Sequence, residues 1–493
     1  MSSRNGSGGG TPEVVIVGAG FGGIGLGIKL KEAGIESFTI LEKASRLGGV
    51  WRDNSYPGLT CDVPSHLYSF SFEPNHEWTR RFPKRDEILA YLERCADKYG
   101  VRDHIRLATE AASADFDEET GRWRIELAGG DEIEADVLVP ATGQLSRPSF
   151  PTIEGLDSFT GEMFHSARWN HDCDLTGKRV AAIGTGASAV QYVPQIAPIV
   201  ERLDLYQRTP GWMVPKPDRP YRPREKALFR RIPLIPRISR RISFTRFELF
   251  TFGMTVAPWL LKGYERAYKR QVRRAIPDPE LRERLIPDYP FGCKRVLVSS
   301  DYLPALARPN VDVIGERISA VTPTGVRTED GVEREVDAIV LGTGFQANEF
   351  LAPMDVRGLG GRDLNHAWRD GAEAYLGLAV SGFPNMFILY GPNTNLGAGS
   401  IITMLESQVG YVVEAVRELG RSGARWMDVR DDVQSAFNDE VQGRLADSVW
   451  VAGCNSWYRT ESGKVTNNWA GFVTEYRRRT RHPDPDDFRL VHA

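Results

Sequence analysis

The chain has 493 residues, with 62 lysines and arginines against 65 acidic residues, which gives a net charge of −3. A chain of this length exceeds the size at which a single core stops growing, so we expect two or more domains. The charge balance gives no reason to expect a nucleic-acid-binding protein.

The first predicted element is a strand that ends in a glycine-rich turn. Apolar residues 14–17 precede Gly18, Gly20 and Gly23, and a helical pattern of apolar residues follows. Such glycines permit a tight turn and close approach of a pyrophosphate, while the helix N-terminus supplies amide donors. Glu42 follows directly on the next strand, about 20 residues past the third glycine, where a ribose-binding acid is expected. We predict an FAD site here; a purely structural turn is the alternative.

The same pattern of strand, turn and helix occurs a second time. Apolar residues 180–183 precede Gly184, Thr185 and Gly186, and alanine replaces the third glycine of the motif, which is a permitted variant. Each glycine loop is also paired with a later strand that ends in Thr-Gly, at 142–143 and 343–344. This repetition predicts two related dinucleotide-binding modules.

The two loops differ where the ribose is expected. After the strand 203–206, the second module carries Arg208 and Thr209 and no acid. A guanidinium binds a 2′-phosphate through paired charged hydrogen bonds, whereas an acid repels it. We therefore predict NADPH rather than NADH; the alternative for Arg208 is a surface residue beside a turn.

Residues 216–274 differ from the rest of the chain in composition. Clustered arginines and lysines alternate there with Phe, Leu, Ile and Trp, and the least charged part, 249–261, is too short to span a bilayer. We expect a helical excursion that packs on its own domain and leaves its charged face in solvent. A basic amphipathic helix on an anionic membrane is the less favoured alternative.

Two separated motifs resemble the fingerprints of the type I Baeyer-Villiger monooxygenases, a family of class B flavoprotein monooxygenases. The first comprises Gly48, Gly49, Val50, Trp51, Tyr56, Pro57, Gly58 and Asp62, and the second comprises Phe159, Gly161, His165 and Trp169. A Trp at 169, where sister flavin monooxygenases carry Tyr or Phe, favours this branch, although Asn170 departs from the usual Pro or Asp. The resemblance extends from residue 14 to about 481 and is weakest in 216–274.

The resemblance implies roles for two cations in the segment 291–295. Arg295, with Asp62 as its partner, would stabilise a negative flavin peroxide, and Lys294 would support Arg208 at the 2′-phosphate. The alternative for Lys294 and Arg295 is that both lie on a solvated loop. The alternative for the segment 51–62 is a buried loop whose aromatic residues belong to the core. We expect a linker role for His165. Trp457 is expected in a C-terminal segment that closes over the site.

The predicted catalytic residues are thus Arg295 and Asp62, and no metal is expected. The predicted cofactor-binding residues are Gly18, Gly20, Phe21, Gly23, Glu42, Gly49, Val50, Trp51, Tyr68, Gly184, Thr185, Gly186, Ser188, Ala189, Arg208, Thr209, Lys294 and Trp457.

The implied fold class is α/β, with two Rossmann-like domains, the FAD domain split in sequence around the NADPH domain, and a helical excursion. The predicted ranges are 1–148 and 378–493 for FAD, 152–215 and 290–377 for NADPH, and 216–289 for the helical subdomain. The implied enzyme uses NADPH and FAD to insert one atom of O2 beside a ketone carbonyl through a flavin C4a-peroxide, giving an ester or lactone. Alternatives are oxygenation of N or S centres, hydroxylation of a carbon chain and, more distantly, a redox flavoprotein without oxygenase activity.

Cysteine usage and the N-terminus bear on location. The five cysteines are widely spaced and include no C-x-x-C pair, which favours reduced thiols over a disulfide framework. Residues 1–11 are rich in Ser and Gly and lack the apolar core of a secretory signal. These features predict a cytoplasmic protein.

Overall fold

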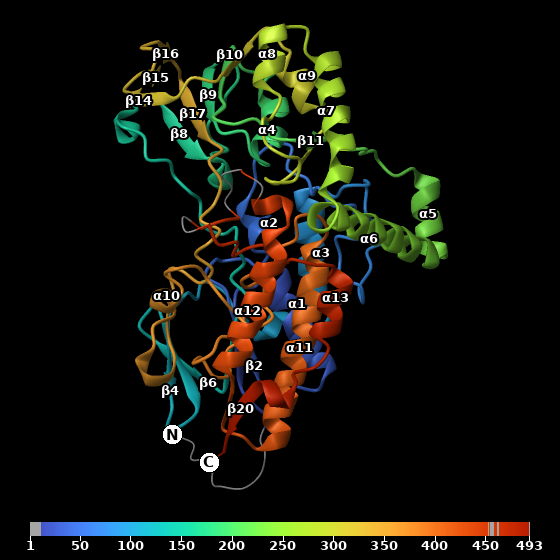
Figure 1. Cartoon of the computed structure of the whole chain (residues 1–493), viewed down its shortest axis with the longest axis vertical. Helices are drawn as coiled ribbons and strands as arrows, with labels where there is room; N and C mark the ends of the chain where they lie inside the picture. Colours follow the sequence, from blue (N-terminus) through green and yellow to red (C-terminus); the bar gives the residue numbers. More distant parts are fainter. Residues whose placement is uncertain (1–10, 452, 454–457, 461–462, 493) are drawn as a thin grey trace.

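The computed structural model describes residues 11–451, 453, 458–460 and 463–492. Two α/β units lie one above the other, and a pair of helices projects from one side of the molecule (Figure 1). The N-terminal and C-terminal parts of the chain build one unit, and the middle of the chain builds the other. This arrangement confirms the predicted α/β class with Rossmann-like sheets.

The first unit is built on a parallel sheet with strand order β3-β2-β1-β7. Its strands are short and rich in Val and Ile, which suits strands that are covered on both faces. The chain returns after the second unit to extend this sheet, since the Leu389 amide donates to the Pro140 carbonyl at 2.8 Å. The strands are β1 (Val14–Val17), β2 (Phe38–Leu41), β3 (Ile105–Arg106) and β7 (Val137–Pro140).

Helices cover this sheet and close the first unit. The long helix α11 packs along α1, so the C-terminal segment buries the helix that follows the first glycine loop. A two-stranded sheet near the C-terminus joins β19 (Trp426–Val429) to β20 (Phe488–Val491). The helices are α1 (Phe21–Glu32), α2 (Val50–Asp53), α3 (Arg85–Lys98), α10 (Leu364–Ala367), α11 (Ile401–Ser422), α12 (Asp431–Ala446) and α13 (Val473–Arg479).

The second unit contains a five-stranded parallel sheet of order β13-β10-β9-β17-β8. A three-stranded antiparallel sheet and a short two-stranded parallel sheet flank it. The strands are β8 (Glu162–His165), β9 (Arg179–Ile183), β10 (Arg202–Tyr206), β11 (Met213–Val214), β12 (Leu297–Val298), β13 (Val311–Ile314), β14 (Ile318–Thr322), β15 (Gly325–Thr328), β16 (Glu333–Glu335) and β17 (Ala338–Leu341). Its helices are α4 (Ala189–Ile196), α8 (Pro279–Arg284) and α9 (Tyr302–Leu306).

The chain crosses between the units along two connections that lie side by side. The Ser149 amide donates to the Gly344 carbonyl at 2.9 Å, so the outgoing and returning connections are bonded to each other. Soon after the return, β18 (Asp355–Arg357) pairs with β4 (Ala111–Asp117) of a second sheet in the first unit. That sheet also contains β5 (Arg122–Leu127) and β6 (Glu132–Ala135). Residues 355–357 thus extend a sheet of the first unit, although the predicted range of the NADPH-binding domain runs to residue 377.

The composition change at residue 216 corresponds to a run of helices. The helices α5 (Pro223–Arg231) and α6 (Leu234–Thr255) project from the side of the molecule, and η4 (Pro258–Leu261) and α7 (Lys262–Ala275) lead back to the second unit (Figure 1). Within the described part of the chain, no helix combines the length and the apolar character needed to cross a bilayer.

The cysteines follow the sequence expectation only in part. Cys61, Cys95 and Cys173 are free thiols, but Cys293 is disulfide-bonded. The prediction of reduced thiols is therefore wrong for Cys293, because spacing along a chain does not report which cysteines a fold brings within bonding distance.

Asp428 on β19 is a buried carboxylate in the core of the first unit. Burial raises its pKa to about 6, although the Gly382 amide donates to its two oxygens at 3.0 and 3.1 Å. The folded pKa lies above the ordinary value of about 3.9, so protonated Asp428 contributes to the stability of the folded state. This contribution is fully present below about pH 4 and is lost as the pH rises through about 6.

We expect Asp428→Asn, which keeps an acceptor oxygen and carries no charge, to raise the free energy of unfolding by about 1–3 kcal/mol at about pH 7 and by little at about pH 4. Urea denaturation of both proteins at the two pH values measures this difference. An offset between the proteins that does not change with pH would contradict the assignment.

Candidate functional site

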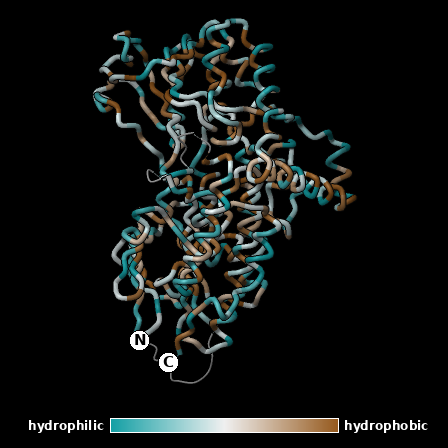
Figure 2. Tube along the Cα trace, in the orientation of Figure 1, coloured by the Kyte–Doolittle hydropathy of each residue, from teal (hydrophilic) through white to brown (hydrophobic). Residues whose placement is uncertain are grey.

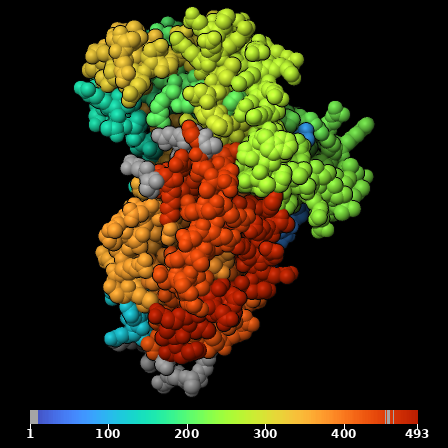
Figure 3. All heavy atoms as spheres, in the orientation of Figure 1, coloured from blue at the N-terminus to red at the C-terminus, as the bar shows by residue number. Residues whose placement is uncertain are grey.

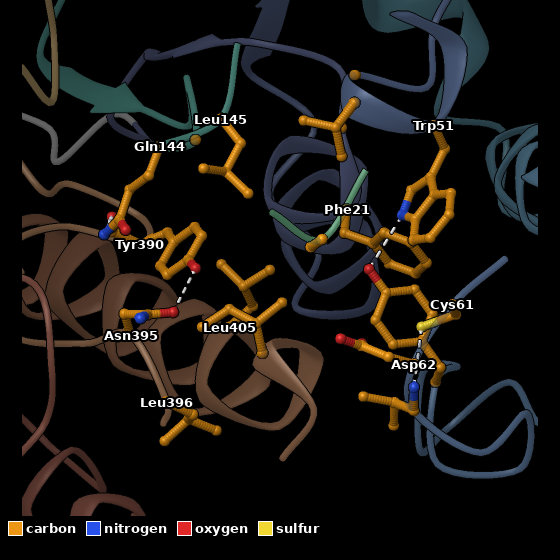
Figure 4. Close-up of a pocket in the computed structure, with 18 of the residues that line it drawn as sticks. Phe21, Trp51, Cys61, Asp62, Gln144, Leu145, Tyr390, Asn395, Leu396 and Leu405 are labelled. Carbon is orange, nitrogen blue, oxygen red and sulfur yellow. Dashed lines mark hydrogen bonds between the residues drawn. The ribbon is translucent and has the colours of Figure 1, made fainter. Parts of the chain in front are cut away.

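One cavity of about 1070 Å³ lies between the two units, and it is lined by Gly18, Gly20 and Gly22 of the first glycine-rich segment and by Ala187 and Ser188 of the second. Its lining includes residues from the first loop, from the segment 48–64, from the start of α4 and from the segment before β12. Helix α6 and the segment 395–401 close another side. Figure 4 shows part of this lining, with Phe21, Trp51 and Asp62 on one side and Gln144, Tyr390 and Asn395 on the other.

The first glycine loop has the tight geometry that its sequence predicts. Gly18 has a φ of +111°, and a Cβ there would lie 2.7 Å from the carbonyl oxygen of Ala141. A Cβ at Gly23 would lie 1.9 Å from the carbonyl oxygen of Gly18, so α1 can approach the turn only with glycine at this position. Helix α1 has no side-chain cap at Gly20, and Gly18 and Gly20 line the cavity. The first turn of α1 is thus placed to offer amides to an anion.

Glu42 lies directly after β2 and lines the same cavity. Its carboxylate accepts hydrogen bonds from the amides of Ala19 and Ala44, each at 3.0 Å. Arg52 forms an ion pair with it at 2.9 Å. These contacts fix the position of the carboxylate beside the glycine loop, where it can accept a hydrogen bond from a ribose hydroxyl.

Aromatic side chains stack behind the loop. The indole N–H of Trp51 donates to the Tyr68 hydroxyl at 3.0 Å, and the Phe21 and Tyr68 rings meet edge to face at 5.4 Å (Figure 4). Gly49, with a φ of +54°, precedes the short helix that carries Val50 and Trp51. All five of these residues line the cavity, so the first fingerprint forms a wall of the site.

Asp62 and Arg295 form an ion pair across the boundary between the units. A guanidinium nitrogen of Arg295 donates to the Asp62 carboxylate at 2.5 Å. Both residues line the cavity, and their side chains retain 39% and 26% exposure for Arg295 and Asp62, respectively. The cation is therefore anchored by a carboxylate and still open to the cavity.

The electrostatics of this pair keep both partners charged. Burial alone would raise the pKa of Asp62, but the charge and hydrogen bond of Arg295, together with Lys216, lower it below its ordinary value. In return, the Asp62 charge raises the pKa of Arg295 despite burial. Burial lowers the pKa of Lys216, which donates to the Thr60 hydroxyl at 2.5 Å.

The second glycine loop repeats the geometry of the first. Gly184 has a φ of +106°, and a Cβ at Gly186 would meet no atom within 4 Å, so space is open in front of the loop. The Thr185 hydroxyl donates to the Thr209 carbonyl at 3.2 Å, which ties the loop to the end of β10. Ser188 lines the cavity, and Ala189 begins α4.

Two cations stand beside this second loop. Arg208 follows β10 and is exposed. Burial lowers the pKa of Lys294, and the neighbouring charge of Arg208 lowers it further. The ammonium of Lys294 also lies 4.9 Å from the centre of the Tyr289 ring. Within the described residues neither cation forms an ion pair, so the two charges are available to an anion.

Helix α4 also holds the first fingerprint in place. The Gln191 side chain accepts a hydrogen bond from the Thr60 amide at 3.1 Å and donates to the Thr60 carbonyl at 3.0 Å. A Cβ at Gly58 would lie 2.7 Å from the Gln191 carbonyl oxygen, so only glycine permits this approach. The segment that carries Asp62 is therefore positioned by the other unit.

His165 and Trp169 of the second fingerprint lie outside the cavity lining. Nδ1 of His165 accepts a hydrogen bond from the Ala167 amide at 3.0 Å, and burial, followed by the charge of Arg168, lowers its pKa to about 4. Trp169 packs on Tyr192 of α4 with ring centres 5.5 Å apart. The linker role of His165 stays a prediction. Trp457 lies outside the described residues.

Sequence reasoning missed a polar group that faces the first glycine loop. The Tyr390 hydroxyl donates to Asn395 at 2.7 Å, and the Gln144 amide donates to the Tyr390 carbonyl at 3.1 Å (Figure 4). Tyr390 has a φ of +63°, which is unusual for a residue with a side chain. Of these residues, only Gln144 could have been found from the sequence, because it directly follows the Thr142-Gly143 turn.

These observations fit the two predicted cofactors. The Gln144 Oε1 atom is buried and has no hydrogen-bond partner among the described residues, although it lines the cavity, so a ligand atom is expected to satisfy it. The uncapped turn of α1 and the Glu42 carboxylate suit a pyrophosphate and a ribose, as FAD provides. Arg208 and Lys294 suit the 2′-phosphate of NADPH.

Comparison with known proteins agrees with this site. Residues 15–232 match the family described as pyridine nucleotide-disulphide oxidoreductase. A "Baeyer-Villiger monooxygenase" of Pseudomonas aeruginosa is 46% identical over 97% of this chain and 91% of its own length. A protein of the same name from Streptomyces coelicolor is 47% identical over 97% of this chain and 92% of its own length.

Solved structures show the same architecture. An oxidized steroid monooxygenase bound to NADP has a TM-score of 0.87 at 32% identity, covering 98% of this chain and 100% of that chain. The closed structure of a cyclohexanone monooxygenase has a TM-score of 0.87 at 29% identity, covering 98% and 99%. A complex of OTEMO with FAD and NADP has a TM-score of 0.87 at 29% identity, covering 97% and 99%.

The first glycine loop provides a matched pair of variants. We expect Gly23→Ala to lower the affinity for the predicted FAD at least about tenfold, because the new Cβ would lie 1.9 Å from the Gly18 carbonyl oxygen and displace the turn. Gly22→Ala is the control, since a Cβ there would lie 3.5 Å from its nearest atoms, which is an ordinary contact. The flavin absorbance of each purified protein measures the effect. Equal flavin content in both variants would contradict the role of the turn.

Proposed function

We propose that this chain, which belongs to the Baeyer-Villiger monooxygenase family, carries out its oxygenation beside the ion pair of Arg295 and Asp62. The protein is an FAD-dependent enzyme that consumes NADPH and inserts one atom of O2 next to a ketone carbonyl, giving an ester or a lactone. The observation that carries the proposal is the Arg295 cation, which Asp62 anchors in the cavity lined by the first glycine loop and by Ser188.

The first unit would hold FAD. The turn of Gly18, Gly20 and Gly23 admits the pyrophosphate at the start of α1, and Glu42 receives a ribose hydroxyl. The wall formed by Phe21, Gly49, Val50, Trp51 and Tyr68 provides apolar surface for the rest of the cofactor, and its hydrogen bond from Trp51 to Tyr68 keeps that wall rigid. When bound, FAD supplies the chemistry that side chains lack, namely acceptance of a hydride and activation of O2.

The second unit would hold NADPH. The open space at Gly186 and the loop residues Thr185 and Ser188 admit the pyrophosphate at the start of α4. Arg208 and Lys294 bind the 2′-phosphate, and Thr209 is tied to the loop by the Thr185 hydroxyl. Two neighbouring cations without a counter-ion among the described residues gain most from a doubly charged ligand.

Arg295 would stabilise negative charge that develops on oxygen during the reaction. A preorganised charge in a site that excludes water stabilises such charge without reorganisation, and this electrostatic contribution is usually the largest in catalysis. The guanidinium stays protonated throughout, since Asp62 raises its pKa. Its role is therefore to hold a fixed positive charge rather than to transfer a proton.

Asp62 would act as the positioning residue for Arg295. Its lowered pKa keeps the carboxylate ionised at neutral pH, so the ion pair persists. Lys216 lies near Asp62 and lends further positive charge. The Gln191 contacts with Thr60 hold the backbone two residues before Asp62. Asp62 thus fixes the direction of the guanidinium.

The substrate would occupy the part of the cavity that faces the helical segment. Phe247 and Phe250 of α6, Leu260, Tyr264 and Leu396 line this part. Aromatic and aliphatic side chains bind the hydrocarbon part of a ketone and exclude water from the carbonyl. O2 is the second substrate that we propose. A cytoplasmic location stays a prediction.

We also propose revised domain ranges. The FAD-binding domain would comprise residues 11–148 and 346–492, because β18 pairs with β4 and the segment 385–389 extends the first sheet. The NADPH-binding domain would comprise 152–215 and 290–344, with 216–289 as the helical subdomain. Limited proteolysis that releases a fragment ending near residue 377 would instead favour the domain boundary at residue 377 that the sequence predicts.

Coenzyme preference tests the assignment of Arg208. We expect Arg208→Ala to raise the Michaelis constant for NADPH roughly ten- to a hundredfold, since a charged hydrogen bond contributes about 1.5–3 kcal/mol. The constant for NADH should change little. Steady-state kinetics with both coenzymes measures the effect, and Lys294→Ala should show a smaller change in the same direction. Equal loss with NADPH and NADH would place Arg208 away from the 2′-phosphate.

The proposed function itself is tested by Arg295→Ala. We expect ester formation to fall by at least about a hundredfold, since loss of one preorganised charge donor costs about 3–4 kcal/mol. Hydride transfer needs contact between nicotinamide and flavin rather than this charge, so NADPH consumption should persist and release hydrogen peroxide. Mass analysis of products from linear, cyclic and aromatic ketones, together with peroxide detection, measures the ratio of ester to NADPH consumed.

Two further variants separate catalysis from structure. Asp62→Ala should act in the same direction but more weakly, because the guanidinium stays charged and loses only its anchor. Arg295→Lys should restore little activity, since an ammonium does not reproduce the fixed donors of a guanidinium. A lower yield of folded Arg295→Ala protein with an unchanged ratio of ester to NADPH would refute the catalytic role.

A further inference from the structure

Helix α6 carries a stripe of apolar side chains that faces away from the molecule. Leu234, Ile238, Ile242, Leu249 and Val256 are each between 49% and 67% exposed. With Thr245 and Phe252 they follow the helical repeat of three or four residues, so they lie along one face. We call these residues the α6 stripe. Figure 2 shows brown, hydrophobic segments along the helix that projects from the side of the molecule.

The stripe continues into the segment after α6. Trp259 of η4 is 69% exposed, and Leu260 and Tyr264 are exposed beside it. A contiguous apolar surface of this kind is rare on a monomer and marks an interaction site. Figure 3 shows that the green and yellow-green atoms of this region form a ridge that stands out from the body of the protein.

Cations without partners flank the stripe. Arg231, Arg237, Arg241, Arg246, Lys262 and Arg266 are exposed, and none forms an ion pair within the part of the chain that the structure describes. By contrast, Arg230 pairs with Glu77 at 2.5 Å, and Arg240 turns inward to the carbonyls of residues 67 and 69. Arg237, Arg241 and Arg246 lie on α6 next to the stripe, and Arg231, Lys262 and Arg266 lie on the neighbouring helices α5 and α7.

The same helix forms a wall of the active-site cavity. Ser239, Ser243, Phe247 and Phe250 line the cavity from the face of α6 next to the stripe. Leu249, Leu260 and Tyr264 are both exposed and part of the lining, so they form an apolar rim where the cavity meets the surface. An occupant of the stripe would thus lie directly at the cavity mouth.

We propose that α6 and η4 dock on a lipid bilayer that contains anionic lipids. An amphipathic helix with apolar residues on one face and arginines at its edges lies in the bilayer interface, where the apolar side chains enter the acyl boundary and the arginines meet the phosphates. Trp259 has the residue type that is enriched at this depth. A second copy of the chain is disfavoured as the occupant, because a symmetric contact would bring the same cations against each other.

Docking has a consequence that rests on the proposed function. If the rim of Leu249, Leu260 and Tyr264 faces the bilayer, an apolar ketone dissolved in the membrane can enter the cavity without crossing water. The preferred substrate class would then be long-chain or polycyclic ketones that partition into lipid. Short water-soluble ketones would enter from the aqueous side with no benefit from the membrane.

Vesicle sedimentation with the holoenzyme tests the docking. We expect wild-type protein to sediment with vesicles of phosphatidylcholine mixed with phosphatidylglycerol, and much less with phosphatidylcholine alone. Binding should weaken when the salt rises from about 0.1 M to about 1 M, because the Debye length falls from about 10 Å to about 3 Å. Ile238→Ser combined with Ile242→Ser should lower binding at least about tenfold. Neither residue lines the cavity.

A matched control uses exposed apolar residues elsewhere. Ile199→Ser combined with Val332→Ser, at positions that are 46% and 43% exposed in the second unit, should leave vesicle binding unchanged. Arg237→Gln combined with Arg241→Gln keeps the apolar stripe and should lower binding only to anionic vesicles, which provides a second test if the serine variant folds poorly. Retained flavin absorbance reports folding of each variant.

Three outcomes would overturn the proposal. The first is wild-type protein that stays in solution with both kinds of vesicle. The second is a dimer in the absence of lipid that dissociates on the Ile238→Ser and Ile242→Ser changes, since a second copy would then cover the stripe. The third is equal loss of binding in the control variant.

Kinetics separates docking from the proposed function. With a long-chain ketone presented in anionic vesicles, the serine variant should show a raised Michaelis constant and an unchanged turnover number, while its kinetics with a short ketone in buffer should equal those of wild type. Absence of any ester from wild-type protein would refute the proposed function and leave the vesicle result standing. Identical constants for both proteins with the vesicle-borne ketone would refute delivery through the rim.

Discussion

The ion pair between Arg295 and Asp62 is the contact on which the site depends, because each partner comes from a different unit of the molecule. The Arg295 guanidinium comes from one unit and the carboxylate that anchors it comes from the other, and both line the cavity. A change in the relative placement of the two units would break this ion pair, so the pair favours the observed placement. The Gln191 contacts to Thr60 reinforce that placement through neutral hydrogen bonds. We propose that the same short segment therefore links catalysis to the packing of the units.

The two dinucleotide loops show how one structural device serves two ligands. Both loops follow a buried parallel strand, and both use glycine where a side chain would meet the backbone of a neighbouring segment. They differ in the charge that follows the next strand. Glu42 is held by two amides and Arg52 in the first unit, whereas Arg208 stands near Lys294 in the second. We propose that the sign of the charge at this position distinguishes a ribose hydroxyl from a 2′-phosphate.

Helix α6 connects the cavity with the surface of the molecule. A helix that packed entirely on its own domain would bury one face and present charged residues on the other. Here one face lines the cavity, a second face exposes apolar side chains, and cations lie at the edges. The expectation of a solvated charged face therefore describes only the edges of α6. This distribution explains why a segment with weak resemblance to the family has an unusual composition: its surface faces the cavity and the surroundings of the molecule rather than a core.

The sequence alone determined the two modules and predicted most of the residues that we propose to face their ligands. Glycine at 18, 23 and 184, the acid at 42 and the arginine at 208 act through backbone geometry and charge a few residues from a strand, and such local effects leave a pattern in the chain. The meeting of Asp62 with Arg295 was inferred from a resemblance, and only the tertiary structure placed the two side chains 2.5 Å apart. Tyr390 and Asn395, the bonding of Cys293, the pairing of β18 with β4 and the outward face of α6 had no local signal. Each depends on which distant segments the fold brings together, and spacing along the chain carries no information about that.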